Sequence, residues 1–106
     1  SRMPVKHIVL MKFKADTPAA ALDGIKAKFT ALKAGGKVPG ILAISFGATF
    51  KTDRAQGFTH ALVVDLESKE ALEVYAAHPD HVEIVTNDLK PNFEGPPCAM
   101  DYEFDL

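Results

Sequence analysis

The chain has 106 residues, of which 47% are hydrophobic and 25% are charged, and its formal net charge is −2. This length predicts one domain with a single core, and the composition is that of an ordinary globular protein, not of a disordered or fibrous one. The small negative charge argues against nucleic acid and anionic membranes as partners, because both are bound through basic surfaces. Small molecules and protein surfaces are the expected partners.

Cysteine content and hydropathy give an expected location. Cys98 is the single cysteine, so no intrachain disulfide can form, and we expect a buried structural thiol and a cytoplasmic protein. No apolar run approaches the roughly 20 residues that a membrane span requires. Ser1 and Arg2 precede Met3 and are interpreted as a cloning remnant, so the predicted domain covers residues 3–106.

The first half of the sequence predicts a strand and a helix. Residues 5–14 alternate with period two and carry apolar side chains on both faces at the centre. Asp16 as the cap and Pro18 at the first helical position predict the start of a helix, and Gly35 predicts its end. The apolar stripe of this helix consists of Leu22, Ile25, Phe29 and Leu32.

Two further strands follow. Residues 41–50 predict a strand in which Gly47 indicates a bulge or a close backbone approach, and residues 58–67 predict the next one. The expected inner face of the first is Leu42, Ile44, Phe46, Ala48 and Phe50, and that of the second is Phe58, His60, Leu62, Val64 and Leu66.

The last part of the chain predicts a helix and an edge strand. Ser68 is a favourable N-cap for a helix to Ala77, and Pro79 breaks or restarts that helix. An apolar stripe of Val82, Val85 and Leu89 continues it. Residues 91–97 form a loop, and residues 98–104 predict a strand.

The resulting order, β-α-β-β-α-β, is typical of an α+β, ferredoxin-like protomer with an antiparallel four-stranded sheet and both helices on one face. Several strands are apolar on both sides, so the uncovered face of the sheet would be an exposed apolar surface. Association of two copies about a two-fold axis would cover it, and the sequence therefore predicts a homodimer.

Polar chemistry is concentrated between Tyr75 and His81. Tyr75, His78 and His81 are spaced by three and three, which places them on one side of a helix if that helix continues through Pro79. His7 and His60 lie on the expected inner faces, so four histidines could share one acid/base pocket. The structural alternative makes His78 a helix cap, His60 a hydrogen-bonded core residue and His81 a surface residue.

Other kinds of site find little support. The pair His78 and His81 could offer two metal ligands, but no HExxH motif, paired cysteines or calcium-loop spacing accompanies them. A phosphate loop and a GxSxG nucleophile are also missing from the sequence. We therefore expect no dedicated metal site and no cofactor.

Several motifs carry a family resemblance. The opening VKHIVLMKFK, the central GFTHALVVDLESKEALEVYAAHPDHV and the closing Asp101-Tyr102 resemble the stress-responsive α/β-barrel (Dabb) family over nearly the whole chain. The resemblance implies a ferredoxin-like protomer that pairs with a second copy to close a dimeric α+β barrel.

The resemblance also implies a site. A plant polyketide cyclase of this family closes its product by aldol condensation, with a histidine at the position of His81 as acid/base and a tyrosine at the position of Tyr75 as helper. The positions of His7, His60 and His78 line or neighbour that pocket.

Three functions stay open at this point. The first is a dimeric stress-response barrel with a pocket for a small apolar or aromatic ligand and no assigned reaction. The second is a cofactor-free cyclase or lyase that uses His81 and Tyr75. The third is a cofactor-independent monooxygenase, an activity found in other families that share the dimeric barrel.

Overall fold

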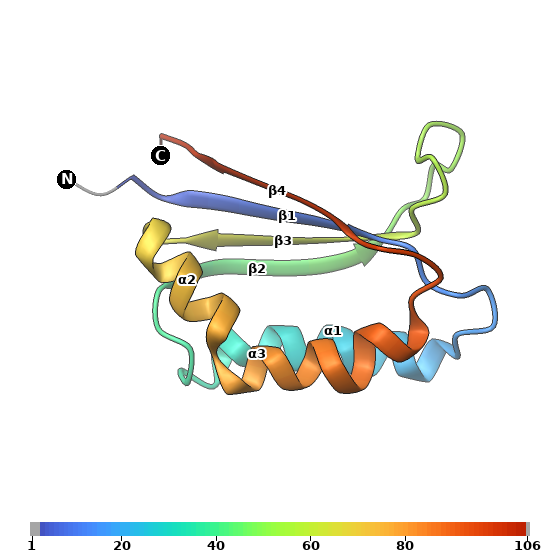
Figure 1. Cartoon of the computed structure of the whole chain (residues 1–106), viewed down its shortest axis with the longest axis horizontal. Helices are drawn as coiled ribbons and strands as arrows, with labels where there is room; N and C mark the ends of the chain where they lie inside the picture. The colour runs from blue at the N-terminus through green and yellow to red at the C-terminus, as the bar shows by residue number, and fades with distance from the viewer. Residues whose placement is uncertain (1–2, 106) are drawn as a thin grey trace.

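Four antiparallel strands form one sheet in the order β2-β3-β1-β4, and the helices lie on one of its faces (Figure 1). The computed structural model describes residues 3–105, so the interpretation of Ser1 and Arg2 lies outside it. Its elements are β1 (Val5–Met11), α1 (Ala19–Ala34), β2 (Ile41–Ala48), β3 (His60–Leu66), α2 (Lys69–Ala77), α3 (Pro79–Ile84), the π-helical η1 (Val85–Leu89), the 3₁₀-helical η2 (Lys90–Asn92) and β4 (Cys98–Glu103). The predicted α+β, ferredoxin-like architecture is confirmed.

The core lies between the sheet and the helices. In β1 and β3 the predicted alternation holds, because Val5, Met11, Leu62, Val64 and Leu66 are each at most 2% exposed. The two strands pair over their whole length, with Val5 opposite Leu66 and Met11 opposite His60. This central pair fixes which side chains of the sheet face the helices.

Helix α1 carries the predicted stripe but begins later than its sequence suggests. Ile25, Phe29 and Leu32 are buried, and Leu22 packs against them. Pro18 occupies the N-cap position in an extended conformation and provides no side-chain cap, so the prediction of Asp16 as cap and Pro18 as first helical residue is wrong. The fixed φ of proline suits either position, and only the ψ of 144° at Pro18 keeps it outside the helix.

Strand β2 contains its irregularity at a different place from the one predicted. The register with β3 shifts between Ile41 and Ala43, whereas Gly47 pairs regularly with Ala61. The extra residue turns Leu42 outward, where it is 41% exposed, while Ile41 packs against the core. The strand ends at Ala48, and Phe50 beyond it does not reach the inner face but is 95% exposed.

The second helical region is divided at His78. Ser68 caps α2 through a 3.1 Å hydrogen bond that its Oγ accepts from the backbone N–H of Ala71, as predicted. His78 is extended at ψ 134°, so α3 starts afresh at Pro79. This break resets the helical phase, and Ile84 takes the buried position expected for Val82, which is 46% exposed.

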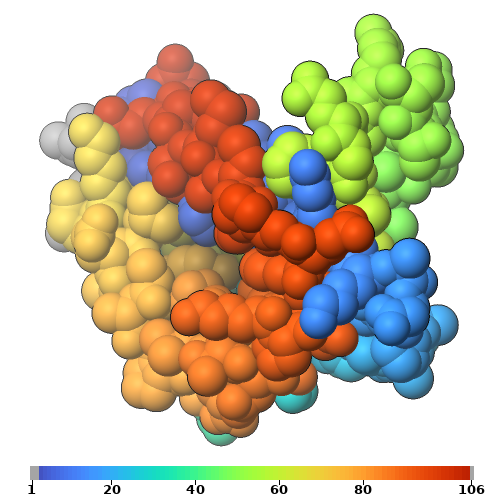
Figure 2. Space-filling model, turned by 45° about the vertical axis from the view of Figure 1, so that its right-hand side comes forward, coloured from blue at the N-terminus to red at the C-terminus, as the bar shows by residue number. Residues whose placement is uncertain are grey.

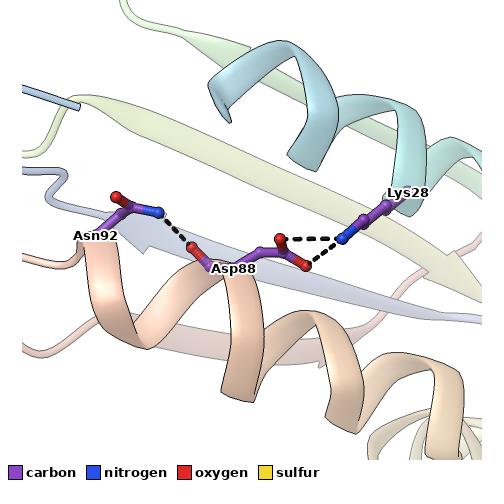
Figure 3. Close-up of polar contacts among 3 residues, drawn as sticks. All are labelled: Lys28, Asp88 and Asn92. Atoms are coloured by element: carbon purple, nitrogen blue, oxygen red, sulfur yellow. Dashed lines mark hydrogen bonds and ion pairs between the residues drawn. The ribbon is translucent and has the colours of Figure 1, made fainter. Parts of the chain in front are cut away.

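An ion pair and a hydrogen bond connect the end of this region to α1. Lys28 Nζ on α1 lies 3.0 and 2.8 Å from the two carboxylate oxygens of Asp88 in η1, and Asn92 Nδ2 donates a 2.8 Å hydrogen bond to the carbonyl of Asp88 (Figure 3). Lys28 is half exposed, so the pair contributes little net free energy. Its geometric effect is to hold η1 beside α1.

The face of the sheet opposite the helices is open. Every residue of β4 is exposed, including Met100 at 68% and Tyr102 at 50%. Cys98 belongs to the same face and is exposed, so the expectation of a buried structural thiol is wrong. The physical reason is that β4 is an edge strand with no helix over this side. Among residues 3–105 no helix is long and apolar enough to cross a membrane.

Candidate functional site

The centre of the candidate site is Tyr75 on α2. Its side chain is 0% exposed, and its hydroxyl oxygen has no hydrogen-bond partner within the described residues. Burial raises the pKa of the Tyr75 phenol well above its usual range, so the hydroxyl stays protonated. An unpartnered buried hydroxyl costs free energy, so a ligand oxygen that accepts a hydrogen bond from Tyr75 would recover that cost.

His81 on α3 packs against this tyrosine. The two ring centroids are 4.4 Å apart, and His81 Nδ1 lies 3.1 Å from the carbonyl oxygen of Ala76. Since a carbonyl only accepts, Nδ1 carries the proton and Nε2 offers a lone pair. Burial is the main cause that lowers the pKa of His81; the hydrogen bond to the carbonyl of Ala76 opposes this effect, and repulsion from the nearby imidazoles of His7 and His78 adds to it. His81 is therefore poised as a neutral base.

A second imidazole approaches Tyr75 from the sheet. The ring of His7 on β1 meets that of Tyr75 edge to face at 5.8 Å, and His7 Nδ1 pairs with Asp101 Oδ1 on β4. His7 and Asp101 are direct partners in the β1–β4 ladder. Asp101 is the residue that the sequence did not identify as part of a site. Asp101 places a carboxylate on the helix-facing side of β4, and only the register of that strand could reveal this.

The other two histidines do not join this group in the expected way. His60 stacks on Phe46 at 5.3 Å, meets Phe13 edge to face at 4.9 Å and bonds Thr59 Oγ1 at 2.9 Å. His60 and His7 lie four residues apart along the ladder, which is roughly 13 Å. Strand register thus sets His60 apart from His7 within the protomer, and one pocket shared by all four histidines stays a prediction. Burial lowers the pKa of His60.

His78 serves as a cap. Its Nδ1 accepts a 3.1 Å hydrogen bond from the backbone N–H of Asp80 and so satisfies a free donor in the first turn of α3. The helix does not continue through Pro79, yet Tyr75 and His81 still meet, because His81 reaches back across the break to Ala76. The structural alternative for His78 is confirmed.

Open cavities lie elsewhere. One of them, of about 510 Å³, is found at one end of the sheet and includes His60 and Cys98 in its wall, and another of about 390 Å³ lies between α1 and α3. Neither Tyr75 nor His81 lines them. Within residues 3–105, no three His, Cys, Asp or Glu side chains gather as metal ligands would. Within the pair, Tyr75 is wholly buried and His81 is partly buried.

The comparison with protein families decides the family. Residues 5–104 match the model described as the stress responsive A/B barrel domain, Dabb. The chain belongs to this family. This Dabb chain is 37% identical over 82% of its length to a stress-response A/B barrel domain-containing protein from Arabidopsis thaliana, of which it spans about a third (32%). It is 28% identical to olivetolic acid cyclase from Cannabis sativa, over 76% of this chain and 78% of that protein.

Solved structures agree with the fold. A hydroxynitrile lyase from Passiflora edulis superposes with a TM-score of 0.83 at 23% identity, covering 99% of this chain and 96% of that one. A dimeric protein of unknown function and ferredoxin-like fold from Bacteroides fragilis gives a TM-score of 0.78 at 30% identity, covering 95% and 96%. The two structures thus share the fold of this chain.

Proposed function

We propose that this Dabb protein binds a small carbonyl- or phenol-bearing ligand beside Tyr75 and moves a proton on it through His81 without a cofactor. The observation that carries the proposal is the wholly buried Tyr75 hydroxyl, which has no partner among residues 3–105 and lies against a histidine. Proteins rarely leave such a donor unpaired unless another molecule pairs with it. A ligand oxygen would supply the missing partner.

The chemistry follows from the protonation states of the two groups. His81 Nε2 removes a proton from a methylene activated by a neighbouring carbonyl, and the Tyr75 hydroxyl donates a hydrogen bond to that carbonyl oxygen as it gains negative charge. The carbanion equivalent attacks a second carbonyl of the same chain and forms one carbon–carbon bond. The proton held by His81 then passes to the new alkoxide, so charge and atoms balance. The ring of His7, oriented by Asp101, contacts the phenol ring of Tyr75 from the side of the sheet.

The relationship to olivetolic acid cyclase supports this reaction class over the others, since a cyclase of that kind is a sequence relative across three quarters of the chain. No contact among residues 3–105 favours a monooxygenase in particular. The ligand class we propose is a short polyketide-like chain or the phenolic acid made from it.

The test uses two variants, Tyr75→Phe and His81→Gln. The first should keep or gain stability while it loses function. Tyr75→Phe removes the unpartnered hydroxyl and keeps the ring, so its free energy of unfolding should equal or exceed that of the parent protein. The same variant should lose binding of 2,4-dihydroxybenzoic acid in titration calorimetry. The parent protein should accelerate hydrogen–deuterium exchange at the methylene of a short β-keto ester, and Tyr75→Phe should not.

His81→Gln separates binding from proton transfer. We expect it to retain the melting temperature within a few degrees and some ligand binding, but to lose the exchange activity. If His81→Gln exchanges protons as fast as the parent protein, the acid/base role of His81 is wrong. A large loss of stability in Tyr75→Phe would show that the hydroxyl serves the fold.

A second candidate function is favoured by the burial of Tyr75. Its side chain is 0% exposed and lines neither of the two cavities described above, which suits a stress-response barrel that holds a ligand or a partner without turning it over. Binding of the phenolic acid with no proton exchange in any variant would favour this candidate.

Both candidates include a homodimer formed through the open face of the sheet. Met100 and Tyr102 on that face are exposed although large and apolar, and burying such side chains is favourable. The Bacteroides fragilis protein with the same fold and 30% identity is described as dimeric. Sedimentation at micromolar concentration should give twice the protomer mass. A single protomer mass across the concentration range would overturn the dimer.

A further inference from the structure

The 510 Å³ cavity is bounded by the sheet and by residues 49–59, the loop that joins β2 to β3 and projects from the body of the molecule (Figures 1 and 2). Its sheet wall contains a row of residues paired across all four strands, namely Gly47, Ala61, Leu10 and Cys98. Since Met11 is buried on the helix side, its neighbour Leu10 faces away from the helices. The cavity has the size of a small-molecule site.

The loop that forms the other wall is ordered by its own contacts. The backbone N–H of Thr49 donates to the carbonyl of Thr59 at 2.9 Å, and the N–H of Phe58 donates to the carbonyl of Ala55 at 3.0 Å. Lys12 Nζ on the sheet side lies 4.8 Å from the ring centroid of Phe58. The wall is therefore in place before a ligand arrives, so binding costs little ordering of the loop.

One residue of this wall holds a strained backbone. Gln56 lines the cavity at φ +54°, and within residues 3–105 it is the single non-glycine residue with a positive φ. A residue with a Cβ in this region costs about 1–2 kcal/mol, and such strain collects at ligand sites. The strained residue and the cavity thus coincide.

The charge of the wall selects the ligand. Arg54 is the only Lys, Arg, Asp or Glu that lines the cavity, and no carboxylate among residues 3–105 forms an ion pair with it. The apolar part of the wall consists of Leu10, Ala48, Ala55, Phe58 and Ala61. A guanidinium matches a planar carboxylate with two parallel hydrogen bonds. An apolar body that carries one carboxylate therefore fits both parts.

His60 adds a hydrogen-bond acceptor to the same wall. Thr59 Oγ1 donates to the carbonyl of Met11 at 3.3 Å, so it accepts from His60 Nδ1 at 2.9 Å. The proton of His60 is then on Nδ1, and Nε2 keeps its lone pair. Burial lowers the pKa of His60, so the imidazole adds no second positive charge near neutral pH. A hydroxyl on the ligand would donate to it.

We propose that this cavity binds a small hydroxylated aromatic carboxylate, whose carboxylate pairs with Arg54, whose ring covers Leu10 and whose hydroxyl donates to His60. Neither Tyr75 nor His81 lines the cavity, so the proposal does not depend on the reaction proposed above. It also needs no second copy, because all of these groups belong to one protomer.

Cys98 provides the reporter, because it is the single cysteine, is exposed and lines the cavity. Saturating 6-hydroxy-2-naphthoate should slow alkylation of Cys98 by iodoacetamide several-fold, at one fixed protein concentration. The neutral 6-hydroxy-2-naphthamide keeps the ring and the hydroxyl and should need an at least about 10-fold higher concentration for half protection. Loss of the hydroxyl in 2-naphthoate should weaken protection about 2- to 10-fold.

Three variants assign the protection to this cavity. Arg54→Gln should raise the half-protecting concentration of the naphthoate at least about 10-fold and keep the melting temperature, because Arg54 is exposed. Lys51→Gln removes an exposed cation of the same loop that does not line the cavity and should leave protection unchanged. Tyr75→Phe should also leave protection unchanged.

The other outcomes contradict the proposal. Equal protection by the acid and the amide, or full protection in Arg54→Gln, would show that Arg54 holds no carboxylate. Equal protection by both naphthoates would remove the contact with His60. Protection that is lost in Tyr75→Phe would place the ligand at the reaction site and overturn this one. No protection at millimolar naphthoate would overturn the cavity as a site and leave the proposed function standing.

Discussion

His7 Nδ1 and Asp101 Oδ1 pair across the β1–β4 ladder, 94 positions apart in the chain. The carboxylate accepts, so it holds the proton of His7 on Nδ1 and leaves Nε2 as the free nitrogen. The ring that it orients is the one that meets Tyr75. A residue on the edge strand thereby influences a group in the interior.

Replacing Asp101 with asparagine should leave His7 no longer fixed in one tautomer. The amide can donate or accept, so we expect a mixture of His7 ring forms in Asp101→Asn, observed in two-bond ¹H–¹⁵N spectra above pH 8. The free energy of unfolding should change by less than about 1 kcal/mol, because the Asp101 side chain is 38% exposed. Asp105→Asn, at an exposed carboxylate outside the ladder, is the control. An unchanged His7 spectrum in Asp101→Asn would contradict the orienting role.

Loss of the cap at His78 should lower the free energy of unfolding measurably. His78→Ala leaves the N–H of Asp80 without its acceptor and should cost about 1 kcal/mol in urea unfolding. His78→Asn, which can accept the same bond, should recover most of that loss. Equal stability of the alanine variant and the parent protein would remove the capping role.

Stability should fall on the acid side because of His81. Its folded-state pKa lies below the ordinary value of 6.5 that it has in the unfolded chain. Between these two values the unfolded chain binds more protons, so stability decreases as pH drops through the window and is fully retained above pH 6.5. His60 acts in the same direction.

The measurement is the free energy of urea unfolding at a series of pH values. His81→Gln should flatten the decrease below pH 6.5, and the double variant His81→Gln/His60→Gln should flatten it further. Parallel curves for the parent protein and His81→Gln would show that His81 titrates alike in the folded and unfolded states.

Replacement by alanine should change the free energy of unfolding in opposite directions at two glycines. Gly40 has φ +88°, and a Cβ there would lie 2.7 Å from the Cβ of Ala71, so Gly40→Ala should cost about 2 kcal/mol or more. Gly24 lies in α1 with nothing within 4 Å of an added Cβ, so Gly24→Ala should gain roughly 0.5–1 kcal/mol. Thermal unfolding of both variants in parallel checks the pair, and a stable Gly40→Ala would show that α2 can move away from the turn.

The sequence by itself determined the features that depend on near neighbours. Ser68 as a cap, Pro79 as a restart and the stripe of α1 require only residues three or four positions apart, and their hydrogen bonds and steric limits act within one helical turn. The alternation in β1 and β3 likewise determined which residues enter the core, and the order of elements predicted the ferredoxin-like fold.

Only the tertiary structure decided which polar groups meet. Tyr75 contacts His7 and His81, while His60 belongs to a separate aromatic cluster, and Asp101 reaches His7 from the far end of the chain. These relationships depend on strand register, the bulge near Leu42 and the break at His78. A shift of one residue in any of them reverses the face on which a side chain lies, and no pattern of residue types within one strand records that choice.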